Sequence, residues 1–98
     1  MTDKLQLLSC AEDDISTSVL WYEKQMNGLG SRFILSIDAT IQSIQRNPLL
    51  YPKVYKNFRR ALTQRFPYGV YYFIERDTIV VVAIFHEKRK PRHWKKRV

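Results

Sequence analysis

Basic side chains, the residues of this sequence most able to bind another molecule, lie almost entirely in its second half. Lys and Arg number 17 against 9 Asp and Glu, which gives a net charge of +8. Residues 50–98 hold thirteen basic and three acidic residues, whereas residues 1–49 hold four and six. A segregated basic surface binds polyanions by neutralising phosphates, and it binds acidic proteins by complementary pairing. The sign of the charge alone leaves both classes of partner open.

The densest basic run, Lys88–Arg97, has seven basic residues in ten and one embedded aromatic residue, Trp94. Such a run suits contact with a polyanion, although a basic tail is also often only solvated. His86 and His93 have no further convergent ligands, so we expect no metal site and no cofactor. Cys10 can form no intrachain disulfide, and beside a helix start we interpret it as a packing residue rather than a nucleophile.

Length and composition are those of one globular domain, which we expect to cover residues 1–98. Hydrophobic residues make up 45% of the chain and charged residues 27%. The longest apolar run, Ile79–Phe85, is far too short to cross a bilayer, and the N-terminus has no pattern of a secretory signal. We therefore expect a cytoplasmic protein without a membrane partner.

The elements that must position these residues begin with a short strand, Lys4–Leu8, and a helix. Ser9–Glu12 matches a capping box, in which the Ser and Glu side chains bind amides of the first helical turn. The helix is expected over about 10–27 and ends at Asn27-Gly28, where a left-handed conformation is tolerated. Its apolar stripe consists of Ile15, Val19, Tyr22 and Met26.

A second helical pattern follows after Gly28–Gly30 and ends at Asn47-Pro48. Its apolar face is formed by Phe33, Ile37, Ile41 and Ile44. Because the connection is short, we expect an antiparallel helical hairpin whose apolar face requires a sheet. Trp21 lies off the stripe of the first helix, and we interpret it as packing under the loop that follows the second helix.

Three strand-like segments follow the loop of residues 48–57. They are Phe58–Phe66, Tyr68–Glu75 and Thr78–Phe85, and the short polar turn between the last two predicts a β-hairpin. We therefore expect a β-α-α-β-β-β order, an α+β fold in which the helical hairpin packs on one face of a small, mainly antiparallel sheet.

The last strand is apolar on both faces. Strict alternation places Ile79, Val81, Ala83 and Phe85 on one face, and Val80, Val82 and Ile84 on the other. Two helices can cover only one face of a sheet. We expect the other to be covered by the C-terminal tail, a second copy of the chain or a different partner.

Taken in order along the chain, several short motifs resemble the RelE/ParE toxins of bacterial type II toxin–antitoxin modules. They are Trp21-Tyr22-Glu23, Gly28–Phe33, Asn47-Pro48, Tyr51-Pro52, Arg59-Arg60, Arg65–Tyr68, Tyr71-Tyr72, and His86 through Arg89-Lys90-Pro91 to Trp94 and Arg97. The resemblance implies a small toxin that inhibits growth and belongs to a plasmid-stabilisation system. A cognate antitoxin, whose tail wraps around the toxin, would neutralise it. Operator DNA would be bound only indirectly, through the antitoxin.

The family contains two unlike activities. RelE-type members cut messenger RNA on the ribosome and carry an arginine early in the middle strand, whereas ParE-type members inhibit DNA gyrase. Tyr68 stands where that arginine is expected, so the resemblance is closer to the ParE branch. A gyrase-binding toxin is therefore our leading hypothesis, with a ribosome-dependent messenger RNA endoribonuclease as the alternative and a basic nucleic-acid-binding module third.

The site residues that the resemblance implies are mostly basic. The residues predicted to bind the target are Arg60, Arg65, His86, Arg89, Arg92 and Trp94. Cleavage of RNA without a metal needs a base, an acid and stabilisation of the phosphorane charge. If the chain is a ribonuclease, these roles would fall to Arg60, Arg65, His86 and Arg89, although a histidine at a strand end is more often structural than catalytic.

Overall fold

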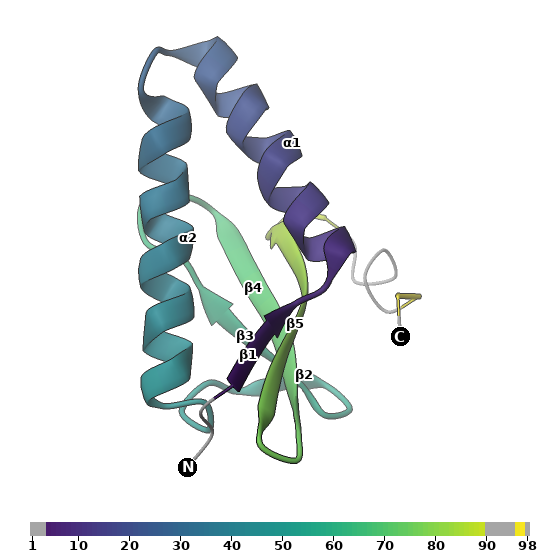
Figure 1. Ribbon diagram of the computed structural model, residues 1–98. Coiled ribbons are helices and arrows are strands. Elements are labelled where there is room, and N and C mark those ends of the chain that lie inside the picture. The colour runs from purple at the N-terminus through teal and green to yellow at the C-terminus, as the bar shows by residue number, and fades with distance from the viewer. Residues whose placement is uncertain (1–3, 90–95, 98) are drawn as a thin grey trace.

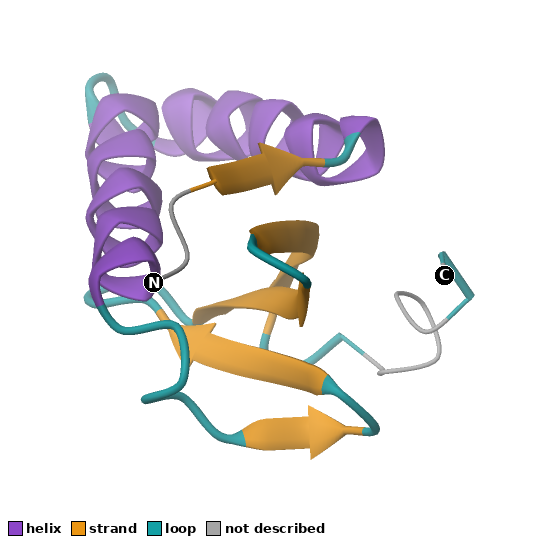
Figure 2. Ribbon diagram, turned by 60° about the horizontal axis from the view of Figure 1, so that its bottom comes forward, coloured by secondary structure: helices purple, strands orange, loops and turns teal. Residues whose placement is uncertain are grey.

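A computed structural model describes residues 4–89 and 96–97, and within them it has two helices and one five-stranded sheet (Figure 1). Along the chain the elements are β1 (Lys4–Leu7), α1 (Ser9–Gln25), α2 (Leu29–Arg46), β2 (Lys53–Tyr55), β3 (Phe58–Leu62), β4 (Tyr68–Glu75) and β5 (Thr78–His86). The sheet order is β1-β5-β4-β3-β2, with β1 parallel to β5 and the other neighbours antiparallel. Both helices lie on one side of the strands (Figure 2), which confirms the predicted α+β fold.

The connection between the helices depends on glycine. Gly28 has a φ of 86°, a left-handed value that favours glycine, and Gly30 lies so close to α1 that an added Cβ would be 2.9 Å from the carbonyl oxygen of Val19. The Glu23 carboxylate accepts hydrogen bonds from the backbone N–H groups of both glycines, each at 3.0 Å. These contacts fix the close antiparallel packing of α1 and α2.

The start of α1 differs from the prediction. Leu8, not Ser9, is the residue that precedes the helix, and no side chain caps it, so the predicted capping box is wrong. The first turn instead uses the carbonyl oxygen of Leu8, which accepts from the N–H groups of Ala11 and Glu12. Strand β1 runs directly into the helix, and Leu8 is itself held by a hydrogen bond from its N–H to Val81.

The core between the helices and the sheet contains the predicted apolar stripes. Phe33, Ile37 and Ile44 of α2 are buried, and the partly buried Ile15, Val19 and Tyr22 of α1 pack against the same cluster. From the sheet the cluster receives Ala61, Val70, Tyr72, Ile79, Val81 and Ile84.

A β-bulge changes which side chains of β5 share a face. Tyr72 pairs with Val81 and Tyr71 pairs with Ala83, so Val82 is an extra residue in the strand. As a result Ile84 packs with the helix-side core, while Val82, Ala83 and Phe85 belong to the cluster on the opposite face. The predicted strict alternation is therefore wrong beyond Val82.

The face of the sheet that the helices leave free is nevertheless buried within the chain. Its cluster of Phe58, Tyr71, Val80, Val82, Ala83 and Phe85 has no member more than 9% exposed. The guanidinium carbons of Arg89 and Arg97 lie 4.0 and 4.7 Å from the centre of the Phe85 ring. The tail thus contributes cover through Arg97, which agrees with the first of the three covers expected for this face.

Three smaller differences concern the loops and Trp21. The segment predicted as a loop, residues 48–57, contains the short strand β2, and β3 ends at Leu62 rather than Phe66. The chain turns sharply at Arg65, which has a φ of 72°. Trp21 is 56% exposed, so the interpretation that it packs under a loop is wrong.

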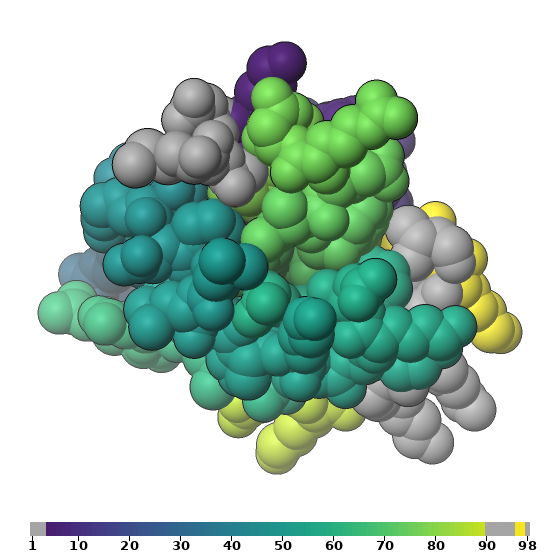
Figure 3. Space-filling view, turned by 90° about the horizontal axis from the view of Figure 1, so that it is seen from below, coloured from purple at the N-terminus to yellow at the C-terminus, as the bar shows by residue number. Residues whose placement is uncertain are grey.

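The loop after α2 is fastened to the sheet by two side chains. Arg59 donates to the carbonyl oxygen of Tyr51 at 2.6 Å, and the Tyr72 hydroxyl donates to that of Pro48, also at 2.6 Å. Figure 3 shows this end of the molecule, with the teal loop and β2 beside the green turn between β4 and β5. Neither described helix is long and apolar enough to span a bilayer.

Candidate functional site

The bulge in β5 turns His86 toward α1. His86 pairs with Tyr68 across the hairpin, and their rings meet edge to face with centroids 5.4 Å apart. A cavity of about 230 Å³ opens here, lined by Asp13, Asp14, Thr17, Ser18, Tyr68, Ile84, His86 and Arg89. Two of the predicted site residues, His86 and Arg89, therefore share one cavity.

Hydrogen bonding defines which atom of His86 is available. Its Nδ1 accepts from the backbone N–H of Lys88 at 3.1 Å, so the neutral ring carries its proton on Nε2. That arrangement lets neutral His86 donate a hydrogen bond through Nε2, which suits binding to an acceptor. Proton transfer to a leaving group would need the doubly protonated ring, in which Nδ1 no longer accepts from Lys88.

Asp14 is one of the two acidic residues that line this cavity, and it is already engaged. Arg97 donates to both of its carboxylate oxygens, at 2.7 and 3.0 Å, and the backbone N–H of Ile84 donates to Oδ2 at 3.0 Å. Arg97 also donates to the carbonyl oxygen of Val82 at 3.0 Å. We call this set of contacts the Asp14–Arg97 clasp; it joins the C-terminal segment to α1 and β5.

The clasp is partly shielded from water, since the side chains of Arg97 and Asp14 are 19% and 9% exposed. The hydrogen bond with Asp14 raises the pKa of Arg97 above its ordinary value. A carboxylate paired in this way is a poor general base because its lone pairs are occupied. Sequence reasoning placed Arg97 in a basic run suited to contact with a polyanion or only solvated, and no local signal links it to an aspartate 83 positions earlier.

The remaining predicted residues are not gathered at the His86 cavity. Arg60 lies on the opposite face of the sheet, beside Gly69, where an added Cβ would be 3.0 Å from its Cγ. Strand β4 separates Arg60 from β5, so Arg60 does not lie on a strand next to the one that leads to Arg89. Arg65 lines a different cavity, described next. Arg92 and Trp94 lie outside the described residues.

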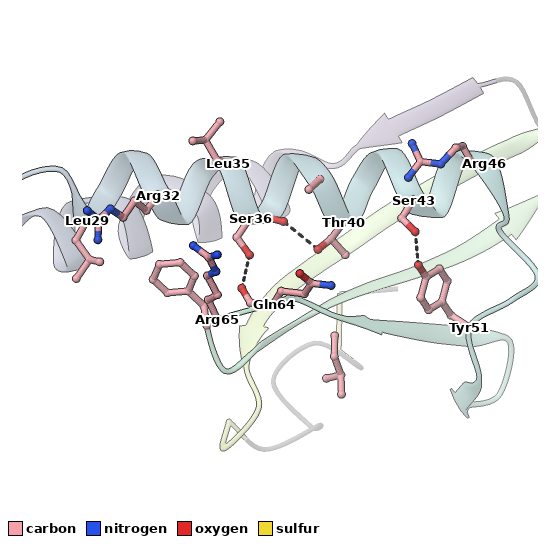
Figure 4. Close-up of a pocket in the computed structure, with 13 residues that line it drawn as sticks. Leu29, Arg32, Leu35, Ser36, Thr40, Ser43, Arg46, Tyr51, Gln64 and Arg65 are labelled. Carbon is pink, nitrogen blue, oxygen red and sulfur yellow. Dashed lines mark hydrogen bonds between the residues drawn. The ribbon is translucent and has the colours of Figure 1, made fainter.

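A larger cavity of about 650 Å³ runs along α2, between this helix and the segment that leads from β3 to β4 (Figure 4). We call it the α2 groove. It is lined by Leu29, Arg32, Leu35, Ser36, Ala39, Thr40, Ser43, Arg46, Tyr51, Leu62, Gln64, Arg65 and Phe66. Ser36 donates to the carbonyl oxygen of Gln64 at 2.7 Å, which ties the turn to the helix. Of the residues that line the groove, the sequence analysis predicted only Arg65 as a site residue.

The described residues contain no group of three or more histidine, cysteine or acidic side chains that could hold a metal ion. The arrangement offers two concave surfaces. One is the His86–Arg89 cavity against α1, which also contains Asp13 and Asp14, and the other is the α2 groove with three arginines.

Comparison with known families decides what kind of protein carries these surfaces. The model of the ParE toxin of type II toxin–antitoxin systems, parDE, matches residues 7–91. The chain belongs to the ParE toxin family.

Among solved structures, the toxin resembles a chain of the chromosomal ParDE toxin–antitoxin system from P. aeruginosa, with a TM-score of 0.78. The match covers 87% of this toxin and 96% of that chain at 13% sequence identity. At that identity the likeness establishes the shared fold. A search of curated protein sequences gives no match.

Proposed function

We propose that this type II toxin inhibits DNA gyrase by binding to it in the cytoplasm, and that a cognate antitoxin neutralises it. The observation that carries this proposal is the environment of Tyr68, the residue that stands where the nuclease branch of the superfamily has an arginine. Family membership supports the toxin role and the antitoxin partner.

Tyr68 is part of an aromatic cluster rather than a free polar group at the surface. Its ring lies 4.8 Å from that of Phe33 and 6.1 Å from that of Tyr22, in addition to its contact with His86. An arginine in this place would lose these ring contacts, and of the two carboxylates that line the same cavity, Asp13 and Asp14, the second is already paired with Arg97. The position is therefore built for packing, which favours a toxin that acts by binding.

The residues proposed to contact gyrase keep their sequence-based assignment. They are Arg60, Arg65, His86, Arg89, Arg92 and Trp94. Among them Arg89 combines an exposed charge with a fixed place, because its guanidinium lies over the Phe85 ring. A cation held in this way loses little conformational entropy on binding an acidic surface.

The alternative, a ribosome-dependent messenger RNA endoribonuclease, is favoured by one observation. His86 and Arg89 line the same cavity. In that reading a doubly protonated His86, with its Nδ1 released from Lys88, would protonate the leaving group and Arg89 would stabilise the phosphorane charge.

Controlled expression in cells separates the two readings. We expect growth arrest with a DNA-damage response and intact messenger RNA. Primer extension on translated messages is the deciding measurement, because cuts within codons at the ribosomal A site would establish the ribonuclease and overturn gyrase inhibition.

Charge reversal tests the assignment of Arg89. Arg89→Glu should abolish growth inhibition while antitoxin binding and thermal unfolding change little. Arg76→Glu is the matched control, since Arg76 is equally exposed but lies in the turn between β4 and β5, at the far end of the hairpin from His86. Equal toxicity of Arg89→Glu and the unmodified toxin would contradict the assignment.

A further inference from the structure

Three exposed apolar side chains gather in one short segment after α2. Leu49 and Leu50 are 70% and 69% exposed, and Val54 of β2 is 40% exposed. Figure 3 looks onto this end of the molecule, where the loop and β2 form the surface. We call residues 49–54 the loop tip. Single exposed apolar residues are ordinary, whereas several in one place mark an interaction surface.

The fold itself makes no use of these three side chains. Within the described part of the chain, they belong to neither of the two apolar clusters of the core. Their neighbours do the anchoring instead, since Tyr51 packs against the helix-side cluster and Tyr55 against the cluster on the opposite face. The loop tip therefore presents to solvent the apolar residues that the core leaves out.

The backbone of the loop tip is held in place by side chains of the sheet. The Arg59 guanidinium donates to the carbonyl oxygens of Leu49 and Tyr51, at 3.3 and 2.6 Å. The Tyr72 hydroxyl donates to the carbonyl oxygen of Pro48, whose ring also restricts the chain just before the two leucines. The leucines are thus displayed on a rigid backbone, which lowers the entropy cost of binding a partner.

The charge along this segment has one sign. Residues 46–60 contain five basic residues and no acidic residue. Lys53 and Lys56 are exposed, and neither has an ion pair within residues 4–89 and 96–97. The turn between β4 and β5 lies beside the loop tip and contains acids, of which Asp77 lies 3.9 Å from Lys4. An apolar segment interspersed with cations is complementary to an apolar pocket with an acidic rim on another protein.

The two other classes of partner suit the loop tip less well. A nucleic acid needs stacking rings or hydrogen-bond donors where the loop tip offers consecutive leucines. A membrane needs more apolar surface, because two leucines and a valine have fewer apolar carbons than a myristoyl chain, which by itself binds membranes only marginally. The chemistry of the loop tip therefore favours an acidic protein surface.

We propose that the loop tip is a contact surface for gyrase, in which its two leucines enter an apolar pocket and its exposed lysine, with Lys56 beside it, pairs with acidic residues around that pocket. This inference rests on the proposed inhibition of gyrase. The loop tip also adjoins Arg60, one of the residues predicted to bind the target, because the backbone N–H of Arg60 donates to the carbonyl oxygen of Pro52 at 3.1 Å.

The test measures the affinity of toxin variants for purified gyrase by biolayer interferometry. Leu50→Asp places a charge in the apolar pocket and should weaken binding by about 50-fold. Leu49→Ser/Leu50→Ser, which adds no charge, should weaken it by about tenfold. Leu20→Asp is the matched control, because Leu20 is 64% exposed on α1, and it should change the affinity by less than about threefold. Thermal unfolding of each variant verifies that the fold is kept.

The charge component is tested separately. The double variant Lys53→Glu/Lys56→Glu should lower the affinity for gyrase and flatten its dependence on salt concentration, whereas Lys24→Glu on α1 should do neither. A photo-crosslinking residue at position 50 should attach to gyrase, and the same residue at position 20 should not. Titration of Leu50→Asp with the cognate antitoxin should show an unchanged affinity.

Each contrary result has a defined meaning. Unchanged gyrase affinity in Leu50→Asp, or an equal loss in Leu20→Asp, would overturn the contact surface while gyrase inhibition stands. Crosslinks from position 50 to the antitoxin or to a second toxin chain would overturn the proposed occupant. Binding of the unmodified toxin, but not of Leu50→Asp, to phosphatidylglycerol vesicles would do the same. A toxin without affinity for gyrase would overturn both this inference and the proposed function.

Discussion

The two sides of the helical hairpin use arginine in opposite ways. On the α1 side, Arg97 is bound by the Asp14 carboxylate and by a backbone carbonyl, so its charge is satisfied inside the chain. On the α2 side, Arg32, Arg46 and Arg65 line a groove that contains no acidic residue. The same side chain is therefore structural where the fold supplies acceptors for its guanidinium, and it is available for binding where the fold supplies none.

This contrast separates charge that maintains the toxin from charge that serves its partners. A net charge of +8 says nothing about that division. The division follows from which arginines meet a carboxylate, and four substitutions test it, from the largest expected effect on the free energy of unfolding to the smallest.

Removing the acid of the clasp should have the largest effect. Asp14→Ala leaves the partly shielded Arg97 without a counter-charge and the N–H of Ile84 without an acceptor, and we expect a loss of about 2 to 3 kcal/mol in the free energy of unfolding. The value is below that for a fully buried pair because Arg97 is partly exposed. Urea unfolding measures it. Asp13→Ala, one position away and exposed, should cost less than about 0.5 kcal/mol; equal losses would show that the clasp contributes nothing specific.

Replacing an aromatic ring by a cation on the α1 side should have the next largest effect. Tyr68→Arg removes the ring contacts with Phe33, Tyr22 and His86 and should destabilise the toxin by about 2 kcal/mol. We expect the variant to cut no messenger RNA. Primer extension after its expression checks this, with Tyr68→Phe as a control that keeps the ring, and cleavage by Tyr68→Arg would bring the ribonuclease reading back.

The loop after α2, which contains the groove residue Tyr51, is held by Tyr72, and this contact produces a pH dependence. Burial raises the pKa of Tyr72 to about 12, and its hydroxyl holds the loop at Pro48. Because the unfolded chain loses this proton near pH 10 and the folded one only near pH 12, stability is fully present below pH 10 and falls as the pH rises toward 12.

The expected loss attributable to Tyr72 is about 1 kcal/mol between pH 9 and pH 11, since a shift of one pKa unit corresponds to about 1.4 kcal/mol. Urea unfolding of the unmodified toxin and of Tyr72→Phe at both pH values isolates it. Tyr72→Phe should be less stable at pH 8 and should have the shallower pH dependence; identical slopes would contradict the assignment.

Neutralising the groove should have the smallest effect on folding. Arg32→Gln/Arg46→Gln removes two unpaired charges and should change the free energy of unfolding by less than about 0.5 kcal/mol. Urea unfolding checks this without any partner. A loss above 1 kcal/mol would mean that these arginines maintain the fold, and the contrast between the two sides would be lost.

The fold was largely predictable because its signals are periodic. The stripe of Phe33, Ile37 and Ile44 placed α2 against the sheet, and the short polar turn after Glu75 gave the β4–β5 hairpin. The capping box failed because the backbone of Leu8 at the end of β1 supplies the acceptor that Ser9 was expected to provide.

The site was harder to predict because its decisive features are not local. When both faces of a strand are apolar, the sequence contains no information about a bulge at Val82, yet that bulge determines the side on which His86 lies. The pairing of Asp14 with Arg97 joins the two ends of the chain. The row from Ser36 to Ser43 resembles an ordinary helix face until β3 and the following turn form the opposite wall of the groove.

The most direct test of the proposed function is DNA supercoiling by purified gyrase in the presence of the purified toxin. We predict inhibition that grows with toxin concentration, is lost in Arg89→Glu, is kept in Arg76→Glu, and is reversed by adding the cognate antitoxin. Full gyrase activity at toxin concentrations far above those of the enzyme, together with cleavage of messenger RNA on ribosomes by the same preparation, would contradict it.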